Sequence, residues 1–154
     1  MRKLALATAV AALAMAAGGQ LAVAHEDHIE TTDPMVEARK GGMTMMVPTL
    51  SAVGRAAEGE GSIARAAFPA SGLASFARSL PALFGPDTDA TKGTAALPAI
   101  WEDEAGFAAQ VAEFQSATAA LEAAARADDR ESFAAALDRT KNACQACHDK
   151  YRAD

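Results

Sequence analysis

The stretch ESFAAALDRTKNACQACHDKY, residues 131–151, carries the pattern that predicts the fold. Its larger apolar residues recur at spacings of three and four, which is the period of one face of an α-helix. Cys144 and Cys147 lie on this inward face, and His148 follows one helical turn after the first cysteine. We therefore expect a long C-terminal helix that presents two thiols and, on nearly the same face, an imidazole.

The spacing Cys-x-x-Cys-His of residues 144–148 is the spacing that attaches a c-type haem. Each thiol can add across one haem vinyl group, so that two thioether bonds form at one edge of the macrocycle. The next residue is then close enough for its imidazole to bind the iron as an axial ligand. The motif predicts one haem c, bound through Cys144 and Cys147, with His148 as the proximal iron ligand.

Two other interpretations of the cysteine pair are weaker. A thioredoxin-like redox disulfide requires a βαβ context, and no strand pattern surrounds the cysteines. A zinc site requires two further ligands. The only other histidines, His25 and His28, have a spacing unlike the usual histidine pair of such a site. The alternative from another class of protein is a helical module that is stabilised by a metal ion and has no haem.

Residues 1–24 have the parts of a secretory signal peptide. Arg2 and Lys3 precede an uncharged run of Ala, Leu and Val, and the small-x-small sequence at 22–24 is a cleavage site. A membrane anchor is the weaker interpretation, because Gly-Gly-Gln interrupts the run before about 20 apolar residues are reached. We expect export to the periplasm, where bacterial haem c is attached, and a mature domain of residues 25–154.

The expected mature chain is acidic. Its 130 residues suffice for one hydrophobic core, and its 12 basic and 20 acidic residues give a net charge of −8. This balance disfavours nucleic acid and anionic membrane surfaces as partners, and no stable membrane insertion is expected. The sequence shows no catalytic constellation beyond the haem motif, so we do not expect an enzyme.

The first helix is predicted to begin at Asp33-Pro34, which combines an Asp N-cap with proline at the first helical position. Its apolar residues, including Met43, form one stripe with a repeat of seven. Gly41-Gly42 weakens this helix and Pro48 removes an internal hydrogen bond. We therefore expect a kink near residues 43–48.

A second helix is predicted over about residues 62–84. Pro69 and Gly72 lie in its first half, so we expect it to begin near Ser71 or to bend there. Residues 85–99 are rich in turn formers and are expected to be a crossover loop.

A third helix is predicted from Phe107 to Ala125, and Asp128 is expected to cap the last helix, with Glu131 completing a capping box. Four helices of about twenty residues must bury their apolar stripes against one another. The predicted fold is therefore all-α: an antiparallel four-helix bundle with covalently attached haem c between its helices.

Several segments resemble the class II c-type cytochromes, the cytochrome c′ family. They are CQACHDKYR at 144–152, LPALFGPDT at 80–88 and LPAIWEDEAGF at 97–107, together with Arg39 and Met43 four residues apart. The first segment is specific, because other c-type cytochromes usually carry the motif near the N-terminus. The resemblance covers most of the expected mature chain and implies an up-down-up-down bundle.

The resemblance also implies roles for individual residues. Arg39 would lie near a haem propionate, and Arg152 would be the basic residue beside His148. Met43 would face the other side of the iron. Two aromatic residues would pack in the haem-side core: Trp101 and Phe107.

Met43 separates the two functions that the resemblance implies. A sulfur that binds the iron makes a six-coordinate His/Met haem, suited to one-electron transfer between redox partner proteins. If Met43 only packs over the iron, the sixth position is open to NO or CO, as in gas binding or NO scavenging. Electron transfer is the favoured function and gas binding the alternative. Relatives also commonly form homodimers through their first two helices, which here contain Pro48 and Pro69.

Overall fold

The computed structural model describes residues 33–89 and 93–153, and the statements below concern these residues. The predicted signal peptide, residues 1–24, lies outside the described residues, as do His25 and His28.

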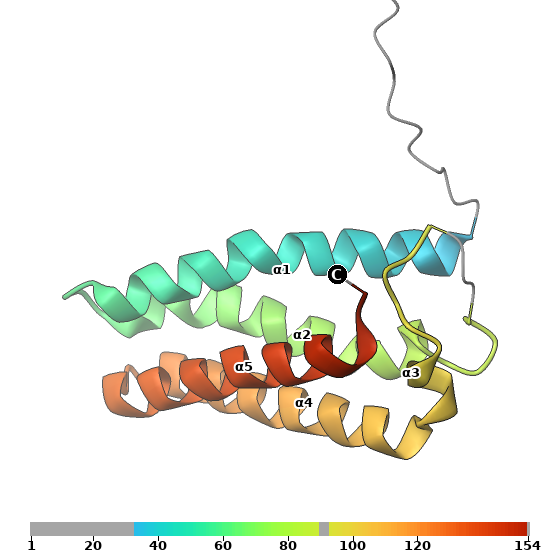
Figure 1. Ribbon diagram of the computed structural model, residues 1–154. Helices are drawn as coiled ribbons and strands as arrows, with labels where there is room; N and C mark the ends of the chain where they lie inside the picture. The colour runs from blue at the N-terminus through green and yellow to red at the C-terminus, as the bar shows by residue number, and fades with distance from the viewer. Residues whose placement is uncertain (1–32, 90–92, 154) are drawn as a thin grey trace, which may run out of the picture.

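The described chain is a four-helix bundle, as predicted (Figure 1). Its long helices run in alternating directions, and α1 and α2 pair beside α4 and α5. A short 3₁₀ helix, η1, precedes α2, and a single-turn helix, α3, precedes α4. The elements are α1 (Pro34–Glu58), η1 (Ile63–Ala66), α2 (Ala67–Leu83), α3 (Ala99–Glu102), α4 (Glu104–Arg126) and α5 (Arg130–Tyr151).

The start of α1 is as predicted. Asp33 accepts hydrogen bonds at its Oδ1 from the backbone N–H groups of Met35 (2.8 Å) and Val36 (3.2 Å), and Pro34 is the first helical residue. The expected weakness around Pro48 does not divide the helix, which continues to Glu58. The bundle partners of α1 therefore outweigh the local cost of proline and glycine.

The start of α2 differs from the prediction. The helix begins at Ala67, directly after η1, so the first alternative, a start near Ser71, was wrong, while the second, a bend there, stays a prediction. Pro69 falls in the first turn of α2, where backbone N–H groups have no intrahelical acceptor and proline costs little.

The cap of α5 was predicted one residue too early. Asp129 is the N-cap, and its Oδ1 accepts from the N–H of Ser132 at 3.1 Å. Asp128 instead has a φ of 54°, a left-handed conformation that Asp tolerates better than most residues. Its carboxylate accepts from the N–H groups of Ile63 (2.6 Å) and Ala64 (3.2 Å), so Asp128 stabilises the start of η1 together with Ser62, the N-cap of that helix.

Two apolar clusters fill the bundle. The η1-end cluster lies around η1 and contains Val53, Ile63, Leu73, Leu121, Phe133 and Leu137. The C-terminal cluster lies near the end of α5 and contains Ala77, Leu80, Ile100, Phe107, Val111, Phe114, Ala143 and Tyr151. Among the described residues, no helix is both long enough and apolar enough to span a membrane.

Helices α1 and α2 approach closely at Gly42. A Cβ atom added there would lie 2.2 Å from Cε2 of Phe76, whereas one added at Gly41 meets nothing within 4 Å. We expect Gly42→Ala to lower the free energy of unfolding by about 1–3 kcal/mol through overpacking. Gly41→Ala should raise it by about 0.5–1 kcal/mol, because alanine loses less backbone entropy on folding. Denaturant unfolding of both variants measures the difference, and equal effects would contradict the close approach.

Candidate functional site

The two cysteines lie on α5 where it borders the C-terminal cluster. Both are half-buried, and both pack against that cluster. Burial raises the pKa of each thiol, and the proximity of Cys144 raises the pKa of Cys147 further. The predicted placement on the inward side of the helix is therefore confirmed, at the edge of the core.

His148 follows them on α5 and is exposed. The sequence placed it on nearly the same face as Cys144, but it lies on the solvent side of that face. Neighbouring protein atoms displace part of the water around the imidazole, which lowers the pKa of His148. The positive charge of Arg152 lowers this pKa further, and the negative charge of Asp149 raises it. The shift favours the neutral imidazole, the form that binds a metal ion.

The fold brings Met43 of α1 to the same cluster as the cysteines of α5. Met43 is half-buried and packs against the C-terminal cluster, as Cys144 and Cys147 do. The neighbouring methionines face elsewhere: Met45 is 61% exposed, and Met46 packs against the η1-end cluster. Of the three, Met43 is thus the one that shares a cluster with the cysteines.

Arg39, one turn before Met43 on α1, has an unusual environment. It is only 3% exposed, and none of its guanidinium nitrogens has a hydrogen-bond acceptor among the described residues. The guanidinium lies over the rings of Phe84 and Trp101, 5.0 and 5.6 Å from their centroids. Burial lowers the pKa of Arg39, and the negative charge of Asp33 opposes that shift.

A guanidinium stays cationic even when buried, and a buried donor without an acceptor costs free energy. The environment of Arg39 therefore fits an anionic group that is not part of the protein. A carboxylate is a suitable partner, because its two oxygens match the guanidinium fork. The residues present thus fit a flat apolar cofactor that carries carboxylates.

Asp103 was not predicted to belong to the site, although it lies in the segment 97–107 that resembles the family. It caps α4 through the N–H of Gly106, which donates to Oδ1 at 3.2 Å. Its Oδ2 accepts from Lys150 Nζ at 2.5 Å and from the Tyr151 hydroxyl at 2.8 Å. These hydrogen bonds, that of Lys150 first, lower the pKa of Asp103 to about 2.

Arg152 follows the last residue of α5 with extended backbone. Its N–H donates to the carbonyl of His148 at 3.1 Å, and it pairs with Ala96 in an antiparallel bridge. Its charge acts on the imidazole of His148, so the two residues that the resemblance linked are neighbours. Trp101 and Phe107 both pack in the core, Phe107 as part of the C-terminal cluster and Trp101 against it, while their place on the haem side stays a prediction.

A four-helix bundle with a Cys-x-x-Cys-His sequence at the end of its last helix defines the bundle class of c-type cytochromes. The family model described as Cytochrome C' matches residues 34–152. The chain therefore belongs to the cytochrome c′ family, whose members bind haem c.

Relatives and solved structures agree with this assignment. Cytochrome c′ of Cereibacter sphaeroides is 39% identical over 157 residues, covering 99% of this chain and 98% of the relative. Cytochrome c′ of Thermochromatium tepidum has a TM-score of 0.71 at 31% identity, covering 78% of this chain and 95% of that one. A ferrous variant of cytochrome c prime from Alcaligenes xylosoxidans with bound NO has a TM-score of 0.70 at 29% identity, covering 81% and 99%.

Proposed function

We propose that this protein is a periplasmic one-electron carrier with a single haem c. Cys144 and Cys147 would hold the haem through thioether bonds, and His148 would be the proximal iron ligand. The observation that carries the proposal is the environment of Arg39. This buried cation has no acceptor within the described part of the chain, and it lies over aromatic rings beside the cluster against which the cysteines pack. Haem c supplies an iron that accepts and releases one electron.

The residues around the site have distinct tasks in this proposal. Arg39 would pair with a haem propionate and relieve the cost of its own burial. Arg152, beside His148, would place a positive charge near the iron. This charge would favour the reduced, ferrous state. The apolar C-terminal cluster would exclude water from the macrocycle.

The proposed location and partners follow from the sequence pattern and the charge. Residues 1–24 would direct export and be removed, which leaves residues 25–154 as the mature domain. Redox proteins are the proposed partners, and an acidic chain is suited to partners with basic surfaces. We propose no catalytic role beyond electron transfer.

The visible and EPR spectra of the holoprotein, with Met43→Ala, test the proposed function. If Met43 binds the iron, the oxidised protein is low-spin with a sulfur-to-iron charge-transfer band, and Met43→Ala abolishes that band. Met46→Ala is the matched control, since Met46 packs against the η1-end cluster. A preceding pyridine haemochrome assay tests for covalent haem; a negative result with bound zinc would support the metal-held module instead.

Gas binding is the second candidate function. It is supported by the similarity to the NO-bound Alcaligenes structure and by the half-buried, apolar position of Met43. In this case the resting protein is high-spin, takes up CO rapidly after reduction, and keeps its spectral type in Met43→Ala. That result would replace electron transfer as the function of the site.

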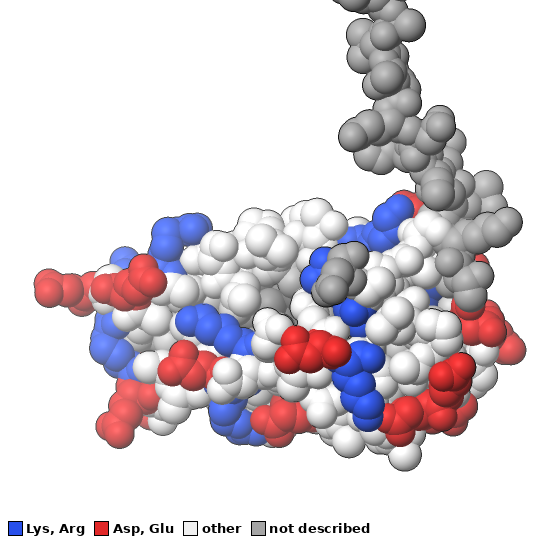
Figure 2. Space-filling model, in the orientation of Figure 1, with Lys and Arg blue, Asp and Glu red and all other residues white. Residues whose placement is uncertain are grey.

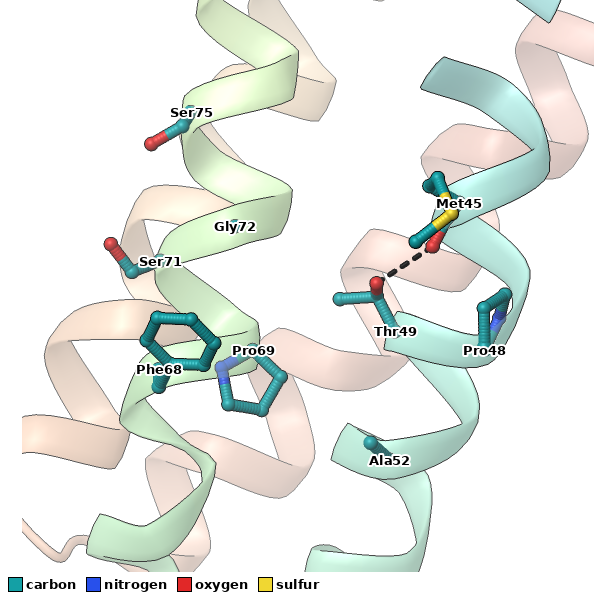
Figure 3. A pocket seen from close by; sticks show the side chains of 9 residues that line it. All are labelled: Met45, Pro48, Thr49, Ala52, Phe68, Pro69, Ser71, Gly72 and Ser75. Carbon is teal, nitrogen blue, oxygen red and sulfur yellow. Dashed lines mark hydrogen bonds between the residues drawn. The ribbon is translucent and has the colours of Figure 1, made fainter. Parts of the chain in front are cut away.

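A second copy of the chain is the proposed partner of the α1–α2 face. Residues 41–54 of α1 and 67–77 of α2 contain no charged residue, and Figure 2 shows an uncharged area over α1. Figure 3 shows the groove between the two helices. The groove has a volume of about 480 Å³, and it is lined from α1 by Met45, Pro48 and Thr49 and from α2 by Phe68 and Pro69.

The exposed side chains of this face suit a dimer. Met45 and Phe68, which line the groove from its two sides, are 61% and 89% exposed, which is unusual for large apolar residues in one area. An uncharged face can pair with its own copy about a two-fold axis without like-charge repulsion. The prolines at 48 and 69 lie inside this face without breaking either helix.

We expect Phe68→Glu to convert the dimer to a monomer, because two carboxylates would be buried in the contact. Sedimentation equilibrium of wild type and variant measures the association. Ala134→Glu, which adds the same charge at an exposed position of α5, should leave the dimer intact. A monomeric wild type at high concentration would contradict the proposed pairing.

A further inference from the structure

The last turn of α5 is attached to the segment before α4 at two levels. At the side-chain level, Asp103 accepts hydrogen bonds from Lys150 and Tyr151. At the backbone level, the N–H of Leu97 donates to the carbonyl of Tyr151 at 3.0 Å, and the N–H of Ala153 donates to the carbonyl of Ala95 at 2.8 Å. Both attachments lie within five residues of His148.

Tyr151 is the centre of this arrangement. Its side chain is 2% exposed, and its ring lies edge-on to that of Phe107 at 5.3 Å between centroids. Its hydroxyl reaches the Asp103 carboxylate, which is itself fixed by the N–H of Gly106 at the start of α4. The phenol is thus held at both ends, by the aromatic core and by the cap of another helix.

Tyr151 follows His148 at a spacing of three, so the two occupy adjacent positions on neighbouring turns of α5. Arg152 is the first residue after the helix. The N–H of Arg152 also closes the last helical turn on the carbonyl of His148 at 3.1 Å. Terminal helical turns fray when nothing holds them. A turn fixed at Lys150 and Tyr151 holds the imidazole of His148 in one direction and Arg152 beside it.

We propose that Asp103 is a positioning residue for His148. It clamps the final turn of α5 to the start of α4 and so sets the direction of the imidazole and the place of the Arg152 charge. This role rests on the proposed function, in which His148 is the iron ligand.

Asp103→Ser tests the clamp in the haem-loaded protein. Serine is a good N-cap, so α4 keeps its start, but its shorter side chain does not reach Lys150 and Tyr151. Tyr151→Phe, which removes only the hydroxyl, is the second variant. The matched control is Glu113→Gln. It removes an ion pair between α4 and α5, that of Glu113 with Arg139 (2.8 Å), which lies away from the final turn.

We expect amide hydrogen exchange at residues 151–153 to become about tenfold faster or more in Asp103→Ser, and to change in the same direction in Tyr151→Phe. The ferric EPR lines should broaden, because the imidazole takes several directions. The reduction potential of Asp103→Ser should differ from that of the wild type by more than the potential of Glu113→Gln does.

Two results would overturn the positioning role alone. One is a haem-loaded Asp103→Ser protein with exchange, EPR and potential like those of Glu113→Gln. The other is faster exchange with unchanged EPR and potential, which would make the clamp a structural contact only. A wild-type protein without covalent haem in the pyridine haemochrome assay would instead overturn the proposed function, and this role with it.

Discussion

His148→Ala should leave the haem attached and abolish the native redox couple. The thioether bonds depend on Cys144 and Cys147, which this change does not touch, whereas the iron loses its proximal imidazole. We expect a positive pyridine haemochrome assay, a changed visible spectrum, and a reduction potential far from that of the wild type. Visible spectroscopy and potentiometric titration of the purified protein measure both effects.

The control for this experiment is Gln145→Ala. Gln145 lies within the motif between the cysteines, is exposed, and donates a hydrogen bond to Asp149. Its removal should leave spectrum and potential almost unchanged. If His148→Ala behaves like this control, the iron has another ligand, and the proposed site is wrong.

Phe133→Ala should have the largest effect on stability. Phe133 is fully buried in the η1-end cluster, and truncation of such a ring costs about 3–5 kcal/mol in lost burial and cavity formation. This is a large part of the stability of an ordinary domain, about 5–15 kcal/mol. Denaturant unfolding followed by circular dichroism measures the loss.

The control is Phe68→Ala, which removes the same ring from a position that is 89% exposed and should change monomer stability by less than about 0.5 kcal/mol. The haem spectrum of folded Phe133→Ala should match the wild type, because the cysteines pack against the other cluster. Similar losses in both variants would contradict the assignment of Phe133 to the core.

The helices could be predicted because their signals are local. The cap at Asp33, the apolar spacing on α4 and the motif on α5 each act within a few residues, and the structure has them as expected. The bundle followed from the need to bury four stripes. Met43 and the cysteines share a cluster because of that packing, although they lie on different helices.

The errors and omissions depend on contacts between distant segments. Asp128 and Asp129 are both residues that favour the N-cap position. The carboxylate of Asp128 accepts hydrogen bonds from N–H groups of η1, so Asp129 is the one that caps α5. Asp103 was missed because its partners, Lys150 and Tyr151, lie on another helix. The exposure of His148 also depends on how α5 packs against the other helices, and helical periodicity alone does not define that packing.

The burial of Arg39 links folding to cofactor attachment. A bundle that closed before the haem was in place would enclose a cation for which residues 33–89 and 93–153 offer no acceptor, and its folded state would carry that penalty. In the proposed holoprotein the propionate removes the penalty, so the cofactor stabilises the native state beyond the effect of its two covalent bonds. The free chain is thereby kept less stable than the loaded one, which favours its clearance by proteases when maturation fails.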